Sequence, residues 1–242
     1  MSLIEIRKVE NKKDLKTFID FHYDLYEGNE YDVPNLFSDE MNTLSKDRNA
    51  AFEFCESEYF LAYKDGKLAG RVAAIINHKA NERWNCKSVR FGWIDFIDDR
   101  EVSKALLQAV EDYGKFKGMD NVVGPLGFTD MDPEGMLTWG FDQLGTMPTI
   151  YNYSYYPEHI EALDGYEVDN KYVEYKLIVP DTVPEKYAKI AAMIEKRYNL
   201  HVRKLTKKDV FQGGYGQKIF ELINATYKDL YGYSELSQKQ ID

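Results

Sequence analysis

The amino-acid sequence predicts an α/β (α+β) protein with a mixed central sheet flanked by helices. Period-two strand patterns and helical spacings of apolar residues alternate along residues 3–180. One run, residues 88–97, is apolar on both faces, which is typical of a central strand. That run leads straight into a helical spacing that stops at Gly118. Strands and helices in this order predict a layered domain in which helices cover a sheet.

The first part of the chain is expected to form a strand, two helices and a hairpin. Asn11 is a typical N-cap for the first helix. Asp65 and Gly66 supply the positive φ angles that a tight hairpin turn requires. The expected elements are a strand at 4–9, helices at 11–25 and 36–44, and hairpin strands at 59–63 and 68–76.

The second part begins with a helix whose start is expected to be capped by Asp98 and Glu101. Residues 125–157 are rich in Gly, Pro and aromatic side chains, and a loop this long on a scaffold tends to carry function. The remaining expected elements are strands at 121–124, 166–168 and 172–179 and helices at 158–163 and 184–198.

The tail of the chain partly repeats its head. Val202-Arg203-Lys204-Leu205 is similar to Ile6-Arg7-Lys8-Val9, and Asp229-Leu230-Tyr231 is similar to Asp24-Leu25-Tyr26. A repeated strand and helix predict the start of a second similar unit. The expected organisation is a domain over residues 1–180, a linking helix at 181–199, and an incomplete second unit over 200–242.

The charge and composition of the chain exclude several classes of binding partner. The chain of 242 residues has 31 Lys and Arg against 41 Asp and Glu, a net charge of −10, which opposes binding to nucleic acid. Two cysteines fit a reducing compartment, so the cytoplasm is expected. No stretch reaches the ~18 apolar residues of a membrane span, and no membrane partner is expected. Nor do His, Cys and Asp residues show the spacing of a metal site, so none is expected.

A family resemblance rests on the order of elements over residues 3–179 and on short motifs. The motifs are Phe91-Gly92-Trp93-Ile94-Asp95-Phe96-Ile97-Asp98-Asp99, Gly124-Pro125, and Met147-Pro148 followed by Asn152 and Tyr155-Tyr156. The chain resembles the acyl-CoA N-acyltransferase (GNAT) superfamily, in particular a little-characterised group of tandem GNAT-like bacterial proteins. The resemblance implies a GNAT-like sheet and transfer of an acyl group from an acyl-CoA, such as acetyl-CoA, to an amine.

The sequence departs from the family where coenzyme A binds. Family members have a Gly-containing turn whose backbone N–H groups bind the pyrophosphate. Here Asp98, Glu101 and Ser103 occupy the corresponding positions, and two carboxylates would repel phosphate. The expected pyrophosphate turn is therefore degenerate, and no cofactor is assigned with certainty. We expect a complete coenzyme A site in the missing second half of the tandem protein.

Two residues are candidates for acid–base roles that the resemblance implies. Asp95, between Trp93 and Ile97, is the candidate base, since apolar neighbours raise the pKa of a carboxyl group; the alternative is a satisfied core acid. Glu161 stands where the resemblance implies the proton-donating Tyr. Tyr155 and Tyr156 lie earlier as possible substitutes, and Tyr156 is taken as the candidate acid.

The tyrosine-rich loop is the candidate substrate-binding wall. Apolar faces with hydroxyl and amide groups suit a pocket for a small molecule or an amine. The candidates are Trp93, Tyr151, Asn152, Tyr153 and Tyr155. The same residues could cover the core or form a homodimer surface. Two functions stay open: an acyltransferase-like enzyme, and a non-catalytic small-molecule-binding or scaffold domain with a GNAT fold.

Overall fold

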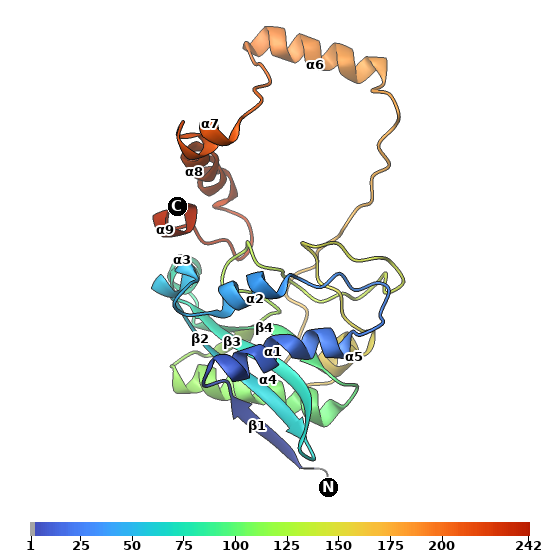
Figure 1. Ribbon diagram of the computed structural model, residues 1–242, viewed down its shortest axis with the longest axis vertical. Helices are drawn as coiled ribbons and strands as arrows, with labels where there is room; N and C mark the ends of the chain where they lie inside the picture. Colours follow the sequence, from blue (N-terminus) through green and yellow to red (C-terminus); the bar gives the residue numbers. More distant parts are fainter. Residues whose placement is uncertain (1–2) are drawn as a thin grey trace.

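A computed structural model describes residues 3–242 (Figure 1). Strands β1 to β5 form one sheet in sequence order, antiparallel throughout except that β5 runs parallel to β4. The mixed sheet and its flanking helices confirm the predicted fold class. The elements of this part are β1 (Ile4–Lys8), α1 (Lys12–Leu25), α2 (Phe37–Leu44), the 3-10 turn η1 (Ala50–Glu53), β2 (Cys55–Lys64), β3 (Lys67–Asn77), α3 (His78–Trp84), β4 (Ser88–Phe96), α4 (Arg100–Phe116) and β5 (Asn121–Val123).

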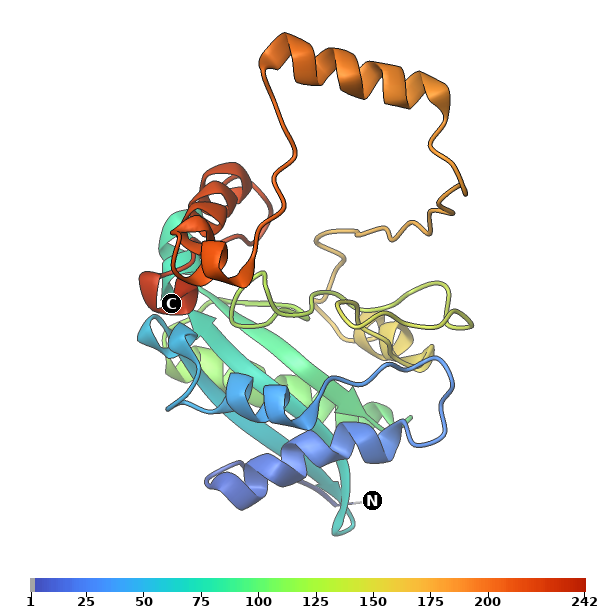
Figure 2. The ribbon, with the colours of Figure 1, turned by 45° about the horizontal axis from the view of Figure 1, so that its top comes forward.

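Helices cover both faces of the sheet. On one face, α4 packs Val102, Leu106 and Val110 against β2 to β4. On the other face, α1 and α2 bury an apolar stripe that includes Phe18 and Leu44 (Figure 2). Burial of side chains this large contributes roughly 2 kcal/mol each, so the helices are held mainly by their apolar faces. The strand β3 between them is buried along most of its length.

Local signals in the sequence set the ends of several elements. The Asn11 side chain accepts hydrogen bonds from the first turn of α1, as predicted. Asp65 and Gly66 both have positive φ, 50° and 79°, and join β2 to β3 in the predicted tight turn. The expected cap of α4 is displaced by one residue: Asp99, not Asp98 or Glu101, accepts from the N–H groups of the first turn.

The C-terminal part contains helices only. Its elements are α5 (Tyr155–Glu161), α6 (Glu185–Tyr198), α7 (Lys207–Phe211), α8 (Tyr215–Tyr227) and α9 (Gln238–Ile241). The strands expected at 166–168 and 172–179 do not form, and the sheet ends at β5 within residues 3–242. Residues 202–205, expected as the strand of the repeated unit, form no strand. The helix α8 lies where the helix of that unit is predicted. The division into a domain, a linking helix and a second unit stays a prediction.

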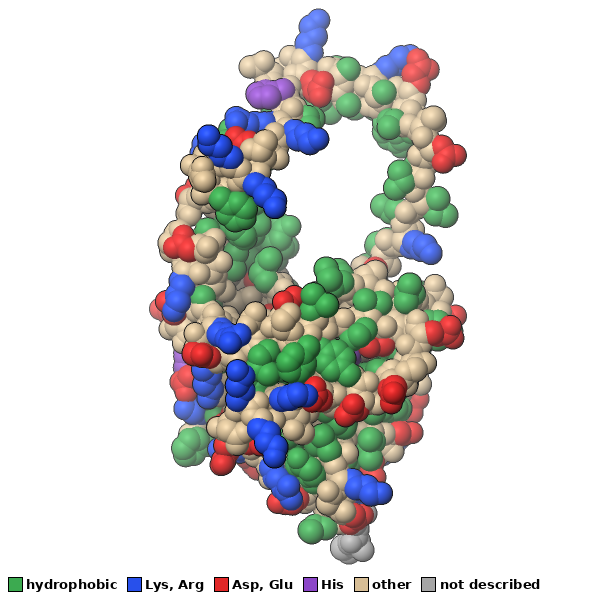
Figure 3. Space-filling model, viewed as in Figure 1, with side chains coloured by type: hydrophobic (Ala, Val, Ile, Leu, Met, Phe, Trp, Pro, Cys, Tyr) green, Lys and Arg blue, Asp and Glu red, His purple; other side chains and the backbone are tan. Residues whose placement is uncertain are grey.

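The end of the chain returns to the sheet. Tyr233 and Ser234 are buried, and the Asn77 side chain at the end of β3 donates to Ser234 Oγ over 3.3 Å. Residues 173–204, by contrast, contain no buried side chain and arch away from the domain (Figures 1 and 3). No helix within residues 3–242 is both long and apolar enough to cross a bilayer.

Candidate functional site

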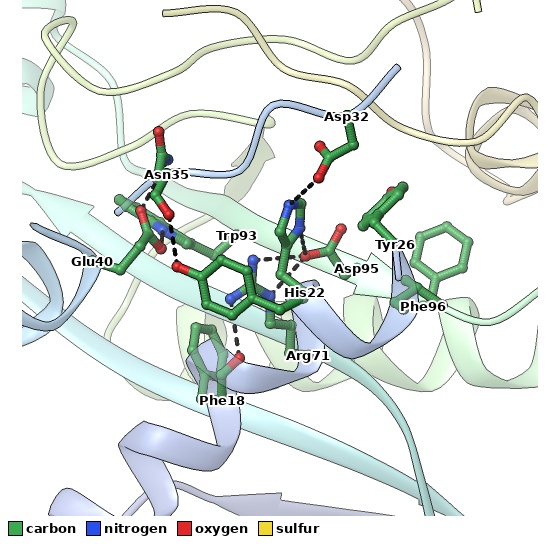
Figure 4. Close-up of polar contacts among 12 residues, drawn as sticks. Phe18, His22, Tyr26, Asp32, Asn35, Glu40, Arg71, Trp93, Asp95 and Phe96 are labelled. Atoms are coloured by element: carbon green, nitrogen blue, oxygen red, sulfur yellow. Dashed lines mark hydrogen bonds and ion pairs between the residues drawn. The ribbon is translucent and has the colours of Figure 1, made fainter. Parts of the chain in front are cut away.

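A cavity lies between α1, β4 and the long loop that follows β5. The volume within which the centre of a water molecule can be placed is about 110 Å³. Its polar lining comes from α1, α2, β3, β4 and the loops. In Figure 4, His22 and Arg71 point to Asp95, whereas Glu40, Asn35 and Trp93 form a second group. The polar lining residues used below are His22, Asp32, Asn35, Glu40, Arg71, Trp93, Asp95, Tyr151, Asn152 and Tyr156.

Asp95 is the centre of this cluster. Arg71 Nε donates to its Oδ2 over 2.7 Å, His22 Nδ1 lies 3.1 Å from the same oxygen, and Tyr156 donates to Oδ1 over 3.1 Å. Burial alone would raise the pKa of Asp95, but the charges of Arg71 and His22 outweigh it and lower the pKa to about 2. This direction is opposite to the expected raised pKa of a general base. Asp95 is a permanently charged group that orients its three neighbours.

His22 stands between two carboxylates. Its Nδ1 faces Asp95, and its Nε2 lies 3.4 Å from Oδ2 of Asp32. Burial favours the neutral ring, but the charge of Asp95 and the hydrogen bond to Asp32 outweigh it and raise the pKa of His22 to about 9. The ring is therefore charged at neutral pH, and its proton is held at the wall of the cavity.

Sequence reasoning did not identify His22, Arg71 or Asp32 as site residues. His22 lies at helical spacing from Leu15, Phe18 and Ile19, where periodicity alone indicates a core residue. Arg71 interrupts an otherwise apolar strand and donates to the carbonyl of Phe18 over 3.0 Å. A charged residue within a buried run was the available signal, since such a charge needs a partner.

Trp93 lies at an irregularity of β4. Arg71 pairs with Asp95 and Ala73 with Gly92, so one extra residue of β4 bulges there. Trp93 has φ of 45°, which is strained for a bulky side chain and costs of order 1–2 kcal/mol. Its Nε1 donates to buried Glu40 over 2.7 Å. The bulge thereby brings Trp93 into the cavity wall, where the sequence placed it.

Two adjacent tyrosines occupy the edge of β4 beyond the end of β5. The Tyr156 hydroxyl accepts from the Phe96 N–H over 3.1 Å, and the Tyr155 hydroxyl donates to the Phe96 carbonyl over 2.7 Å. Tyr156 also accepts from the Tyr26 hydroxyl, and burial raises its pKa well above the usual value. The proton of Tyr156 is already committed to Asp95, so this geometry gives the acid role predicted for it no support.

The tyrosine-rich loop divides between the cavity and its supports. Tyr151 and Asn152 line the cavity together with Trp93, whereas Tyr153 and Tyr155 are not part of its lining. Asn152 is buried and holds the loop by bonding both the N–H and the carbonyl of Leu137. Tyr153 stacks on the ring of Tyr26 at 4.8 Å. Their roles toward a substrate stay predictions.

The first N–H groups of α4 already have a side-chain partner. Asp99 Oδ1 accepts from the N–H groups of Glu101 and Val102, and Lys64 pairs with the other oxygen. Ser103 is fully buried and bonds His159, whose Nε2 lies 3.0 Å from Asp98. Two N–H groups of the first turn are thus bonded to the Asp99 side chain, and the carboxyl groups of Asp98, Asp99 and Glu101 lie at this end of the helix. Among residues 3–242, no group of His, Cys, Asp and Glu could hold a metal ion.

Comparison with known proteins adds two curated relatives. No protein-family model matches the sequence. Protein YghO of Escherichia coli (strain K12) is 34% identical over 161 residues, 66% of this chain and 41% of that protein. Bacterial ceramide synthase of Caulobacter vibrioides (strain NA1000 / CB15N) is 25% identical over 241 residues, 98% of this chain and 61% of that protein. The chain therefore spans less than two thirds of either relative.

Solved structures with a similar arrangement are acetyltransferases. The aminoglycoside N-acetyltransferase AAC(6')-Iy, in complex with a bisubstrate analogue, aligns with a TM-score of 0.44 and 18% identity over 74% of this chain and all of that one. A predicted acetyltransferase of Clostridium acetobutylicum with acetyl-CoA gives 0.43 and 9% identity over 72% of this chain and 96% of that one. In the chain itself, the antiparallel strands β1 to β4, the helix α4 and the parallel strand β5 follow in the order that the sequence resemblance predicted. The chain thus has a mixed five-stranded sheet flanked by helices, in the order of elements that was expected for a GNAT-like domain.

Proposed function

We propose that this chain is part of an N-acyltransferase and that its cavity binds the amine that accepts the acyl group. The observation that carries the proposal is the charge inside the cavity. Three carboxyl groups, of Asp32, Glu40 and Asp95, face two cations, Arg71 and the raised-pKa His22, which leaves one carboxyl group in excess. Because Coulomb interactions are stronger away from bulk water, an ammonium group is the ligand that neutralises this site.

Asp32 is the carboxylate with capacity for the ammonium group. Asp95 has Arg71, His22 and Tyr156 as partners, and Glu40 accepts from Trp93 and Asn35. Within the described residues, Asp32 has a single ion pair, with His22 at 3.4 Å. A carboxylate can accept up to four hydrogen bonds, so Asp32 can bind a substrate ammonium while keeping His22.

The walls beside Asp32 favour an amine that carries an apolar chain. The apolar side chains that line the cavity are Ile19, Val33, Pro34, Ile94, Pro125, Pro133, Met136 and Ile150. A polar end and an apolar wall are the usual division of a small-molecule site. A curated relative is named bacterial ceramide synthase, and a ceramide is the fatty amide of a long-chain amino alcohol. Both observations support an alkylamine as the molecule that accepts the acyl group.

His22 is the proton acceptor in this proposal. An amine attacks an acyl carbon only after it loses the proton of its ammonium form, and the pKa of an alkylammonium is about 10. A His22 ring with pKa about 9 is close enough to that value to exchange the proton, and Asp32 holds the two groups together. As the C–N bond forms, the bond between the acyl carbon and the donor's leaving group breaks, and that group departs with the electron pair. Because His22 must be neutral to accept, the rate of acylation is expected to rise about tenfold per pH unit up to pH 9.

Binding of octylamine and of octan-1-ol, measured by titration calorimetry at pH 7, tests the acceptor site. We expect the amine to bind and the alcohol to bind at least tenfold more weakly, because only the amine carries the neutralising charge. Asp32→Asn should remove this preference, whereas Asp39→Asn, an exposed acid on α2, should leave it intact. Equal binding of amine and alcohol would contradict the proposal.

One observation favours the second candidate, a non-catalytic binding domain with the same fold. At the start of α4, the N–H groups of Glu101 and Val102 already donate to Asp99, which supports a helix start that binds no pyrophosphate. In that case octylamine would still bind, but the protein would form no amide from octylamine with any acyl donor supplied. Detection of N-acyloctylamine by mass spectrometry therefore separates the two functions.

A further inference from the structure

The helix α6 has an apolar face with no partner. Tyr187, Ile190, Ile194 and Tyr198 recur at three- and four-residue spacing and therefore share one side of the helix. All four are exposed, and α6, described over its whole length, has no buried residue. Exposure of this much apolar surface in water is unfavourable, so the face is suited to an interface.

Positive charge accompanies the apolar face. The basic segment, defined here as residues 185–208, contains eight Lys and Arg and two Glu, a net charge of +6. Since the whole chain has a net charge of −10, the remaining residues have −16. Figure 3 shows the Lys and Arg side chains gathered around the junction of α6 and α7. The basic residues are Lys186, Lys189, Lys196, Arg197, Arg203, Lys204, Lys207 and Lys208.

The placement of these charges matches a helix that lies flat on a surface. Successive residues of an α-helix are rotated by about 100° around its axis. Lys186 and Arg197 therefore lie at one border of the apolar face, and Lys189 and Lys196 lie on the opposite side of the helix. Long basic side chains at such a border extend along the apolar surface and keep their charge in water. Lys204, Lys207 and Lys208 follow directly and are exposed.

We propose that α6 and the basic segment dock this protein on the surface of an anionic phospholipid bilayer. The apolar face of α6 enters the boundary between headgroups and acyl chains, and the basic side chains pair with lipid phosphates. The apolar face decides for the membrane against a nucleic acid, because phosphate backbones would pair with the basic segment but leave the apolar face of α6 exposed. The proposal requires no membrane span and is independent of the proposed acyltransferase function.

Vesicle flotation of the full chain tests the proposal. The probes are vesicles of phosphatidylcholine alone and of phosphatidylcholine with 30% phosphatidylglycerol, at 0.1 M and 0.5 M NaCl. We expect flotation with the anionic vesicles at low salt and little with neutral ones, because screening and loss of lipid charge both weaken the attraction. Equal flotation with both vesicle types, or flotation with neither, would overturn the proposal.

Variants separate the two contributions. Lys204→Gln with Lys207→Gln should weaken binding roughly 25-fold, since each surface cation contributes about fivefold. Ile190→Ser with Ile194→Ser should weaken it by roughly tenfold or more through loss of apolar contact. The matched control, Lys12→Gln with Lys13→Gln on α1, removes two exposed cations elsewhere and should bind like the wild type. Equal loss in the control would point to unspecific charge attraction and overturn the assignment to α6.

The competing occupant is a second copy of the chain, whose acidic remainder could also attract the basic segment. Sedimentation velocity at the concentrations used for flotation decides between them. A monomer that floats with anionic vesicles supports the membrane. A stable dimer that is disrupted by the Ile190→Ser and Ile194→Ser changes and does not float would replace the membrane by a second copy.

Discussion

The hydroxyl of Tyr156 donates a hydrogen bond to Oδ1 of Asp95 over 3.1 Å, and both side chains are buried. Through this bond, α5 and the long loop before it are tied to the bulged part of β4. The same hydroxyl accepts from the Phe96 N–H, so it also satisfies the strand edge that β5 leaves unpaired. Tyr156 thereby orients the carboxylate around which the cavity is built.

Tyr156→Phe is expected to destabilise the fold by about 1–3 kcal/mol. The substitution leaves Asp95 Oδ1 and the Phe96 N–H buried without this partner. Urea unfolding followed by circular dichroism measures the change. Tyr166→Phe, which removes a half-buried hydroxyl bonded to Glu111, is the matched control and should change stability by less than about 1 kcal/mol. Equal effects of the two substitutions would contradict the positioning role of Tyr156.

Asp95→Asn should be more costly, by about 3–5 kcal/mol. An asparagine cannot balance the buried charge of Arg71, which then loses its carboxylate partner, and His22 keeps only Asp32. The exposed Asp164→Asn should stay within about 0.5 kcal/mol of the wild type in the same unfolding experiment. A cost below about 1 kcal/mol for Asp95→Asn would mean that water or other side chains compensate the two cations.

Stability is expected to fall as the pH rises from 7 to 9. The pKa of His22 is about 9 in the folded chain against 6.5 as its ordinary value, so the folded state binds this proton more tightly. The resulting stabilisation, roughly 3 kcal/mol, is fully present below pH 6.5 and is lost as the pH passes 9. Chemical unfolding across this range measures it. In His22→Gln the slope should be much smaller, and equal slopes would refute the assigned His22 protonation.

Acetyl-CoA should not bind this chain with micromolar affinity. The first N–H groups of α4 already donate to Asp99, and the nearby carboxylates repel phosphate. Titration calorimetry at low salt is the measurement, and Asp99→Ala is the informative variant because it frees those N–H groups. Micromolar binding by the wild type would show that the start of α4 accepts the pyrophosphate after all.

Much of the sheet could be predicted from local sequence, whereas the polar cluster could not. Asn11 and Asp65-Gly66 act within a few residues, so the patterns around them predict α1 and the hairpin correctly. The bonds of Asp95 to His22 and Arg71 connect residues 73 and 24 positions apart. Periodicity indicates that His22 and Arg71 face inward, but it does not indicate which charges meet there.

Two further differences have simple physical causes. The cap of α4 moves from Asp98 to Asp99 because both are good capping residues and only the path of β4 decides which one begins the helix. Residues 172–179 have the pattern of a strand, yet a strand also needs backbone pairing with a neighbour, which a local pattern does not provide, and this run pairs with none of β1 to β5.

A crystal structure of the protein with octylamine tests the central claim most directly. We predict that the amine nitrogen lies within about 3 Å of an Asp32 carboxylate oxygen, with the alkyl chain along Val33, Pro34 and Ile150. His22 should keep its contact with Asp95 in that complex. Octylamine bound outside this cavity, or bound inside it with its nitrogen away from Asp32, would contradict the assignment of an amine-acceptor site.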